Sequence, residues 1–176
     1  MPMPIATVEE FYAHALAIER EAADRYGEFA AYFSDRDEDA LAGLCKSLAS
    51  MEREHFDELG AACATLTLPA ISALQYQWLE ADAPESAARE LLYRVATPRQ
   101  LLEIALAAEW RAHEFFVGIA RTAPLKAVRE LASVMAAEEG EHVQWVRKAL
   151  EYRDATGLDW DTLLAQGVGP GAATSD

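Results

Sequence analysis

Cysteine, glycine and positive charge are all scarce in this chain of 176 residues. The only two cysteines, Cys45 and Cys63, match neither a zinc ribbon nor a CxxC redox pair. They also cannot supply the four clustered thiolates of an iron–sulfur or rubredoxin-type centre. We therefore expect both to be small buried apolar residues. Glycine is scarce before the last ten residues, which favours helices.

Positive charge is in deficit, because 15 Lys and Arg face 30 Asp and Glu and leave a formal net charge of −15 at pH 7. Phosphate surfaces recruit Lys and Arg, so this balance argues against a nucleic-acid or anionic-membrane partner. Acidity of this size suits solubility or the attraction of cations. Most of the carboxylates are expected simply to coat outer helix faces.

Long hydrophobic runs are lacking as well. The longest largely apolar stretch, residues 61–74, is too short to span a membrane and is interrupted by Pro69. The start MPMPIATVEE has no basic region with an apolar stretch behind it, so we expect no secretory signal. These features predict a cytoplasmic protein with no membrane partner.

The apolar residues that are present, 52% of the chain, recur at helical spacing and rarely alternate with period two. The sequence therefore predicts an all-α fold with four helices. Thr7 and Glu10 form a capping box that starts the first helix, and Thr97 and Pro98 start the third. Pro124 separates the third helix from the fourth.

The second helix should follow residues 34–37, which offer several N-cap candidates. Residues 65–96 contain two prolines and are expected to form a long crossover between the second and third helices, with a short helix over residues 85–94. We expect one bundle domain over residues 1–166 and a disordered Gly-rich tail over residues 167–176. The apolar stripes of the four helices are Phe11, Ala15, Ile18, Ala22, Tyr26, Phe29 and Phe33; Leu41, Leu44, Cys45, Leu48, Phe56, Leu59 and Ala62; Leu102, Ala105, Leu106, Ala112, Phe116 and Ala120; and Val128, Leu131, Met135, Val143, Val146 and Leu150.

Polar residues interrupt these stripes at matching places in the two halves of the chain. Glu109 follows Glu19 by 90 residues, and the two Glu-x-x-His segments lie 87 residues apart. An internal duplication of a helical hairpin is the economical interpretation. The six residues are Glu19, Glu52, His55, Glu109, Glu139 and His142.

These residue types at this spacing point to a metal site. Residues at i and i+3 of a helix share one side, so each Glu-x-x-His presents an oxygen and a nitrogen to one point. Two such segments plus two facing Glu residues are typical of ferritin-like di-iron and di-manganese carboxylate proteins. Four carboxylates supply a charge that balances two divalent irons, and without metal they would repel one another. The mixed oxygen and nitrogen donors favour two iron ions, with manganese possible, over zinc.

The run AIEREAADRY, the two Glu-x-x-His segments and LAAEWRAHEFF resemble rubrerythrin-like proteins of the ferritin-like superfamily. The resemblance covers Thr7 to Tyr152 and implies an antiparallel four-helix bundle with a long crossover between helices 2 and 3. It also implies that Glu52 and Glu139 bridge the metals, while Glu19 and Glu109 are terminal ligands. Arg53 stands where bacterioferritins carry their haem-binding Met, so we expect no haem.

Two further residues could take part in the chemistry. Tyr26, two turns beyond Glu19, could donate a hydrogen bond to a ligand carboxylate or give up one electron, whereas Phe116 at the equivalent place cannot. His113, one turn after Glu109, could be an additional ligand or a hydrogen-bond donor to one. The alternative for both is an ordinary core side chain with its polar atoms satisfied locally.

The sequence and the resemblance together predict a di-iron oxidoreductase that reduces peroxide or dioxygen and is reset by an external electron donor, in a homo-oligomer such as a dimer. One alternative is a ferroxidase that handles or stores iron. Another is a hydroxylase of a bulky substrate, which a deep apolar channel would favour. A purely structural metal site is the third.

Overall fold

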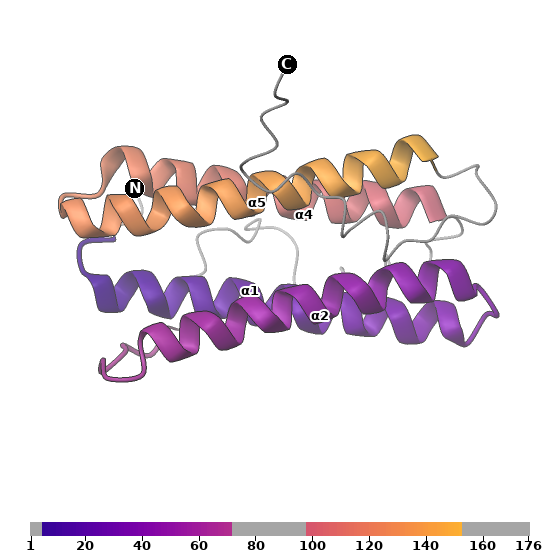
Figure 1. Cartoon of the computed structure of the whole chain (residues 1–176), viewed down its shortest axis with the longest axis horizontal. Coiled ribbons are helices and arrows are strands. Elements are labelled where there is room, and N and C mark those ends of the chain that lie inside the picture. The colour runs from indigo at the N-terminus through magenta and orange to yellow at the C-terminus, as the bar shows by residue number, and fades with distance from the viewer. Residues whose placement is uncertain (1–4, 72–97, 153–176) are drawn as a thin grey trace, which may run out of the picture.

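The computed structural model describes residues 5–71 and 98–152, and within these ranges the chain forms four α-helices (Figure 1). They are α1 (Val8–Ser34), α2 (Asp39–Ala62), α4 (Pro98–Thr122) and α5 (Lys126–Tyr152). The predicted all-α four-helix bundle is therefore confirmed. None of the helices in the described ranges combines the length and the apolar character needed to cross a bilayer.

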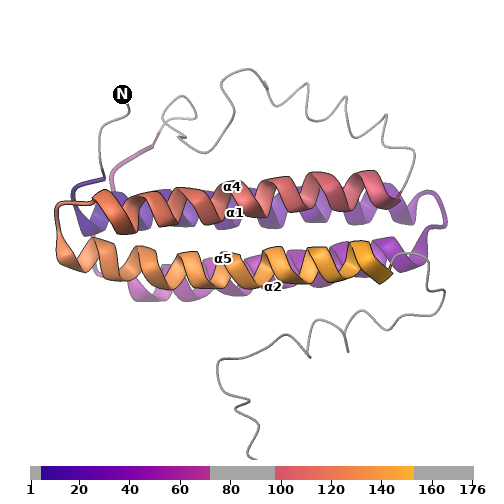
Figure 2. The same ribbon diagram turned by 90° about the horizontal axis from the view of Figure 1, so that it is seen from above.

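The bundle consists of two helical hairpins laid on one another. α1 packs against α2 and α4 packs against α5. Between the hairpins, α1 also contacts α5. Seen from above, α4 lies over α1 and α5 lies over α2, and the two helices of each of these pairs run antiparallel (Figures 1 and 2). α2 and α4 thus run in the same direction, so the chain between them has to return along the bundle. These helix directions agree with the predicted long connection between the second and third helices. Residues 72–97 of that connection, with the predicted helix over 85–94, and the tail over 167–176 lie outside the described residues.

The starts of the first two helices differ. The predicted capping box of α1 is confirmed, because Thr7 Oγ1 accepts from the Glu10 backbone N–H at 3.1 Å and Glu10 Oε2 accepts from the Thr7 N–H at 3.2 Å. The N-cap predicted for α2 within residues 34–37 is wrong. Asp35 instead caps the end of α1, and Asp37 takes a left-handed conformation with φ 57° to turn the chain. The N-cap of α2 is Glu38, whose side chain makes no capping hydrogen bond.

The apolar core lies in two clusters, one towards each end of the bundle. Most residues of the predicted stripes are buried in these clusters, and the free thiols of Cys45 and Cys63 are buried as predicted. Burial raises the pKa of the Cys45 thiol to about 12, as expected of a cysteine that serves as packing. The end of α2 departs from the prediction, because Ala62 is exposed. One cluster includes Phe11, Tyr12, Ile18, Phe116 and Met135, and the other includes Tyr26, Phe29, Phe33, Leu44 and Leu102.

Candidate metal centre

Four carboxylates and two imidazoles meet in the middle of the bundle, between the two apolar clusters. Each helix supplies at least one of them, because the polar residues replace apolar ones on the inward faces. Five of the six are buried to an unusual degree for charged groups, whereas the side chain of His55 is 25% exposed. The relative exposures of the other five are 1% for Glu19, 2% for Glu52, 4% for Glu109, 2% for Glu139 and 1% for His142.

The side chains form two overlapping triads that could each hold a metal ion. Glu52, His55 and His142 offer ligand atoms that all lie within 4.8 Å of one another, and so do Glu109, Glu139 and His142. His142 belongs to both triads. Glu19 belongs to neither, but its Oε2 lies 3.8 Å from His55 Nδ1.

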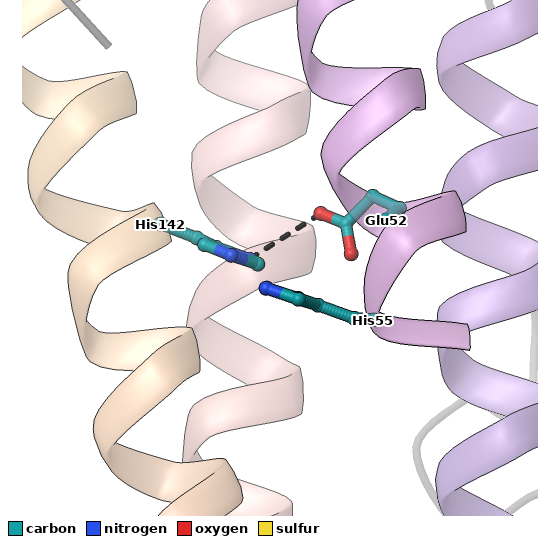
Figure 3. A group of neighbouring side chains, drawn as sticks. All are labelled: Glu52, His55 and His142. Atoms are coloured by element: carbon teal, nitrogen blue, oxygen red, sulfur yellow. Dashed lines mark ion pairs between the residues drawn. The ribbon is translucent and has the colours of Figure 1, made fainter. Parts of the chain in front are cut away.

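The two histidines come from opposite hairpins and lie face to face (Figure 3). Their ring centroids are 5.1 Å apart and the ring planes differ by only 3°. His142 Nδ1 lies 3.3 Å from Glu52 Oε1, 3.4 Å from Glu109 Oε2 and 3.5 Å from Glu139 Oε2. One imidazole nitrogen therefore faces three carboxylates at the centre of the bundle.

Several of these buried polar atoms have no hydrogen-bond partner within the described part of the chain. They are both carboxylate oxygens of Glu19, Nδ1 of His55 and both ring nitrogens of His142. Leaving one buried polar group unsatisfied costs roughly 1–3 kcal/mol. Natural cores avoid that cost, so a concentration of unsatisfied donor atoms in one place indicates a ligand that would engage them.

In the metal-free site, burial and the mutual repulsion of the carboxylates shift the pKa values of the ionisable groups. Burial, followed by repulsion from Glu139 and Glu52, raises the pKa of Glu19 well above its usual value. Burial also raises the pKa of Glu139 to about 8. For Glu52, burial acts upward, but the charge of His142, its hydrogen bond and the smaller effects of Glu19 and His55 together outweigh burial and lower the pKa. Burial acts downward on His142, and its carboxylate neighbours, Glu52 first, raise its pKa well above the usual range. Without metal, the site therefore holds protons.

Tyr26 lies beside the cluster, as the sequence predicted. Its buried hydroxyl donates a hydrogen bond to Glu109 Oε1, from α1 across to α4. Burial and the neighbouring Glu109 carboxylate raise the pKa of Tyr26, so the phenol keeps its proton. Phe116, at the equivalent place in the other hairpin, offers no such donor.

His113, unlike Tyr26, makes its hydrogen bond away from the six clustered side chains. Its Nδ1 donates to the backbone carbonyl of Ala136 at 2.8 Å, its ring packs on Trp110, and it belongs to neither triad. This geometry matches the alternative of a hydrogen-bonded core histidine. The ring lies against Gly140, where an added Cβ would stand 3.6 Å from His113 Nδ1.

Three residues near the cluster were not singled out for a role at the metals from the sequence. Trp145 stacks on the His142 ring with centroids 5.1 Å apart. Arg25 and Arg111 line a small cavity that reaches the carboxylates. In the sequence, only position pointed to these arginines: Arg25 directly precedes Tyr26, and Arg111 follows Glu109 by two residues.

No family model matches the chain, and no curated protein does. The chain is similar to COG1633, an uncharacterized conserved protein from Magnetospirillum magnetotacticum MS-1 with a crystal structure at 2.00 Å resolution. The two share 33% sequence identity and superpose with a TM-score of 0.70, over 82% of this chain and 94% of that chain. At this identity and coverage the likeness extends beyond the fold, and the chain belongs to the COG1633 family of conserved proteins.

Proposed function

We propose that this protein is a di-iron oxidoreductase of the rubrerythrin-like type, in which the six residues bind two iron ions and peroxide or dioxygen is reduced. One observation carries the proposal. Four buried carboxylates and two imidazoles from four helices converge on one point and leave donor atoms unsatisfied there. Charged groups are buried at such a cost only when they are paired or bind metals.

The donor set supports iron, or manganese, more than other metals. Carboxylate oxygens combined with imidazole nitrogens, two in one triad and one in the other, suit metals of intermediate hardness, whereas zinc prefers closed tetrahedral sites with fewer oxygens. The four carboxylates carry four negative charges, which two divalent ions would neutralise. When bound, two ferrous ions supply two electrons, so that peroxide with two protons yields two water molecules and an external donor restores the ferrous state.

The chain's own residues would hold the ions, exclude water and manage protons. Glu52, Glu109 and Glu139 all face the same His142 nitrogen, and by the resemblance Glu52 and Glu139 would be the two carboxylates shared between the ions. Tyr26 fixes the Glu109 carboxylate through its hydroxyl proton. The apolar clusters on both sides keep bulk water from the site. The electron donor, a dimeric assembly and a cytoplasmic location remain predictions.

Anaerobic loading with ferrous iron tests the proposal. We expect two irons per chain, followed in stopped-flow mixing by fast oxidation with peroxide or dioxygen. Glu52→Gln should prevent binding of the two irons. The control is Glu54→Gln, which changes an exposed glutamate of the same helix and should behave as wild type. Failure to bind iron would contradict the proposal, and uptake far beyond two irons per chain would favour the ferroxidase and storage alternative.

A further inference from the structure

Three aromatic rings from two helices stack at the candidate metal centre. The His142 ring of α5 lies against the His55 ring of α2, with centroids 5.1 Å apart and planes 3° apart (Figure 3). It also lies against the Trp145 ring of its own helix, with centroids 5.1 Å apart and planes 26° apart. Residues three apart in a helix share one side about one turn apart, which explains this second contact. Trp145 therefore extends the stack by one ring beyond the six candidate ligands.

Trp145 reaches the surface of the described bundle, whereas the ring on which it stacks does not. His142 is 1% exposed, and the four carboxylates of the centre are at most 4% exposed. Trp145 is only half-buried. The rate of electron transfer falls steeply with the gap that the electron has to cross. A donor that touches Trp145 from outside is therefore one ring spacing away from a candidate ligand that it cannot touch directly.

Two other side chains could carry electrons inward, but each is less well placed. Tyr26 is fully buried and its hydroxyl is bonded to Glu109, so an outside donor cannot touch it. His55 is 25% exposed but belongs to only one of the two triads. His142 belongs to both triads, so an electron that arrives through its ring can reach either metal position.

We propose that Trp145 is the residue through which electrons enter the metal centre when the oxidised protein is reset. The inference rests on the proposed function and deepens it by naming the point at which an outer-sphere one-electron donor meets the protein. Two donor molecules each lose one electron at the Trp145 ring, the electrons pass through His142, and two ferric ions become ferrous. No bond to the donor forms, and Trp145 is unchanged after each transfer.

Removing the ring tests the inference. The iron-loaded protein is oxidised with peroxide and then mixed anaerobically with hexaammineruthenium(II), an outer-sphere one-electron donor, while the ferric absorption is followed. Trp145→Leu should slow this reduction about tenfold without changing the preceding oxidation, and Trp145→Phe, which keeps a ring, should restore most of the rate. Trp145→Met replaces Trp145→Leu if that variant fails to fold. The matched control is Trp110→Leu, because Trp110 is 45% exposed and packs on His113 rather than on a candidate ligand.

A second measurement needs no iron. Cobalt(II), an open-shell ion, should quench the fluorescence of Trp145 when it is added to the metal-free protein, because the indole stacks directly on a candidate ligand. The quenched part of the emission should vanish in Trp145→Phe and persist in Trp110→Phe. Manganese affinity, measured by calorimetry, should be the same in all variants, which separates loss of the electron path from displacement of His142.

Wild-type reduction rates in iron-loaded Trp145→Leu would overturn the inference alone and would make His55 the point of entry. A slower reduction with an equal loss of manganese affinity would also overturn it, because Trp145 would then only position His142. A wild-type protein that binds no iron, or that binds iron without reacting with peroxide or dioxygen, would instead overturn the proposed function and this inference with it.

Discussion

The hairpins α1–α2 and α4–α5 each contribute two glutamates and one histidine to the candidate metal site, yet the surroundings of these residues differ. His142 is 1% exposed and faces three carboxylates at 3.3–3.5 Å. Its counterpart His55 is 25% exposed and faces Glu19 at 3.8 Å. The duplicated pattern therefore places one histidine at the centre of the cluster and the other at its edge.

The terminal carboxylates differ in the same way. Glu109 accepts a hydrogen bond from the Tyr26 hydroxyl, whereas both oxygens of Glu19 lack a hydrogen-bond partner within the described residues. The cause is one substitution within the repeat, Tyr26 in α1 against Phe116 in α4. The two hairpins thus share the donor atoms but differ in the neighbours of these atoms, and we expect the two metal positions to differ in affinity.

The largest expected effect separates the two histidines. His142→Ala removes a member of both triads and should weaken metal binding at least about 100-fold, beyond the usual cost of losing an outer hydrogen-bond partner. His55→Ala removes a member of one triad and should leave one metal bound. Calorimetric titration with ferrous or manganous ions measures both, and equal losses would mean that the hairpins are equivalent.

The second prediction concerns pH. Glu139 has a folded pKa of about 8 against 4.5 as its usual value, so its contribution to the stability of the metal-free fold is present below about pH 4.5 and is lost as the pH rises through about 8. The raised pKa values of Glu19 and His142 act in the same direction, and the lowered pKa of Glu52 opposes them.

Thermal unfolding of the metal-free protein should therefore show a melting temperature that falls between roughly pH 5 and pH 8. Metal binding should release protons and should strengthen over the same range. Glu139→Gln, which cannot ionise, should flatten the profile of the metal-free protein. A melting temperature that rises with pH in the metal-free wild type would refute this account of the site.

The third prediction concerns substitutions that remove the difference between Tyr26 in α1 and Phe116 in α4. Tyr26→Phe removes the donor to Glu109 and should lower the free energy of unfolding by about 1.5–3 kcal/mol, the usual range for a hydrogen bond to a charged group. Phe116→Tyr places a hydroxyl at the equivalent position, where Glu19 needs a donor, and should cost less than Tyr26→Phe. Chemical denaturation of the metal-free variants measures the difference, and a neutral Tyr26→Phe would mean that the hydrogen bond is not formed in solution.

The smallest effect compares the starts of α1 and α2. Thr7→Ala removes a capping box and should lower the free energy of unfolding by about 1 kcal/mol. Glu38→Asp gives α2 the side-chain cap that it lacks and should raise the free energy of unfolding by up to about 1 kcal/mol. Denaturation midpoints check both, and a loss of stability in Glu38→Asp would show that the backbone there does not accept a cap.

Much of the fold could be predicted from local patterns. Helical periodicity gave the four helices, and the capping box at Thr7 and the proline at 124 located two of their boundaries. The N-cap of α2 could not be predicted, because several residues that favour N-caps follow one another. Ser34 and Asp35 belong to the end of α1, and Asp37 lies in the turn before α2. Similarly, the exposure of Ala62 depends on what lies across from the end of α2, which periodicity does not reveal.

The sequence by itself determined which side chains could meet, since each Glu-x-x-His lies on one helix face and the repeat aligns the two halves. Only the tertiary structure decided how they meet: that His142 is central and His55 peripheral, that Tyr26 reaches Glu109, and that His113 turns to the Ala136 carbonyl. The physical reason is that helix periodicity orients residues around one axis, whereas distances between residues on different helices depend on how the hairpins pack.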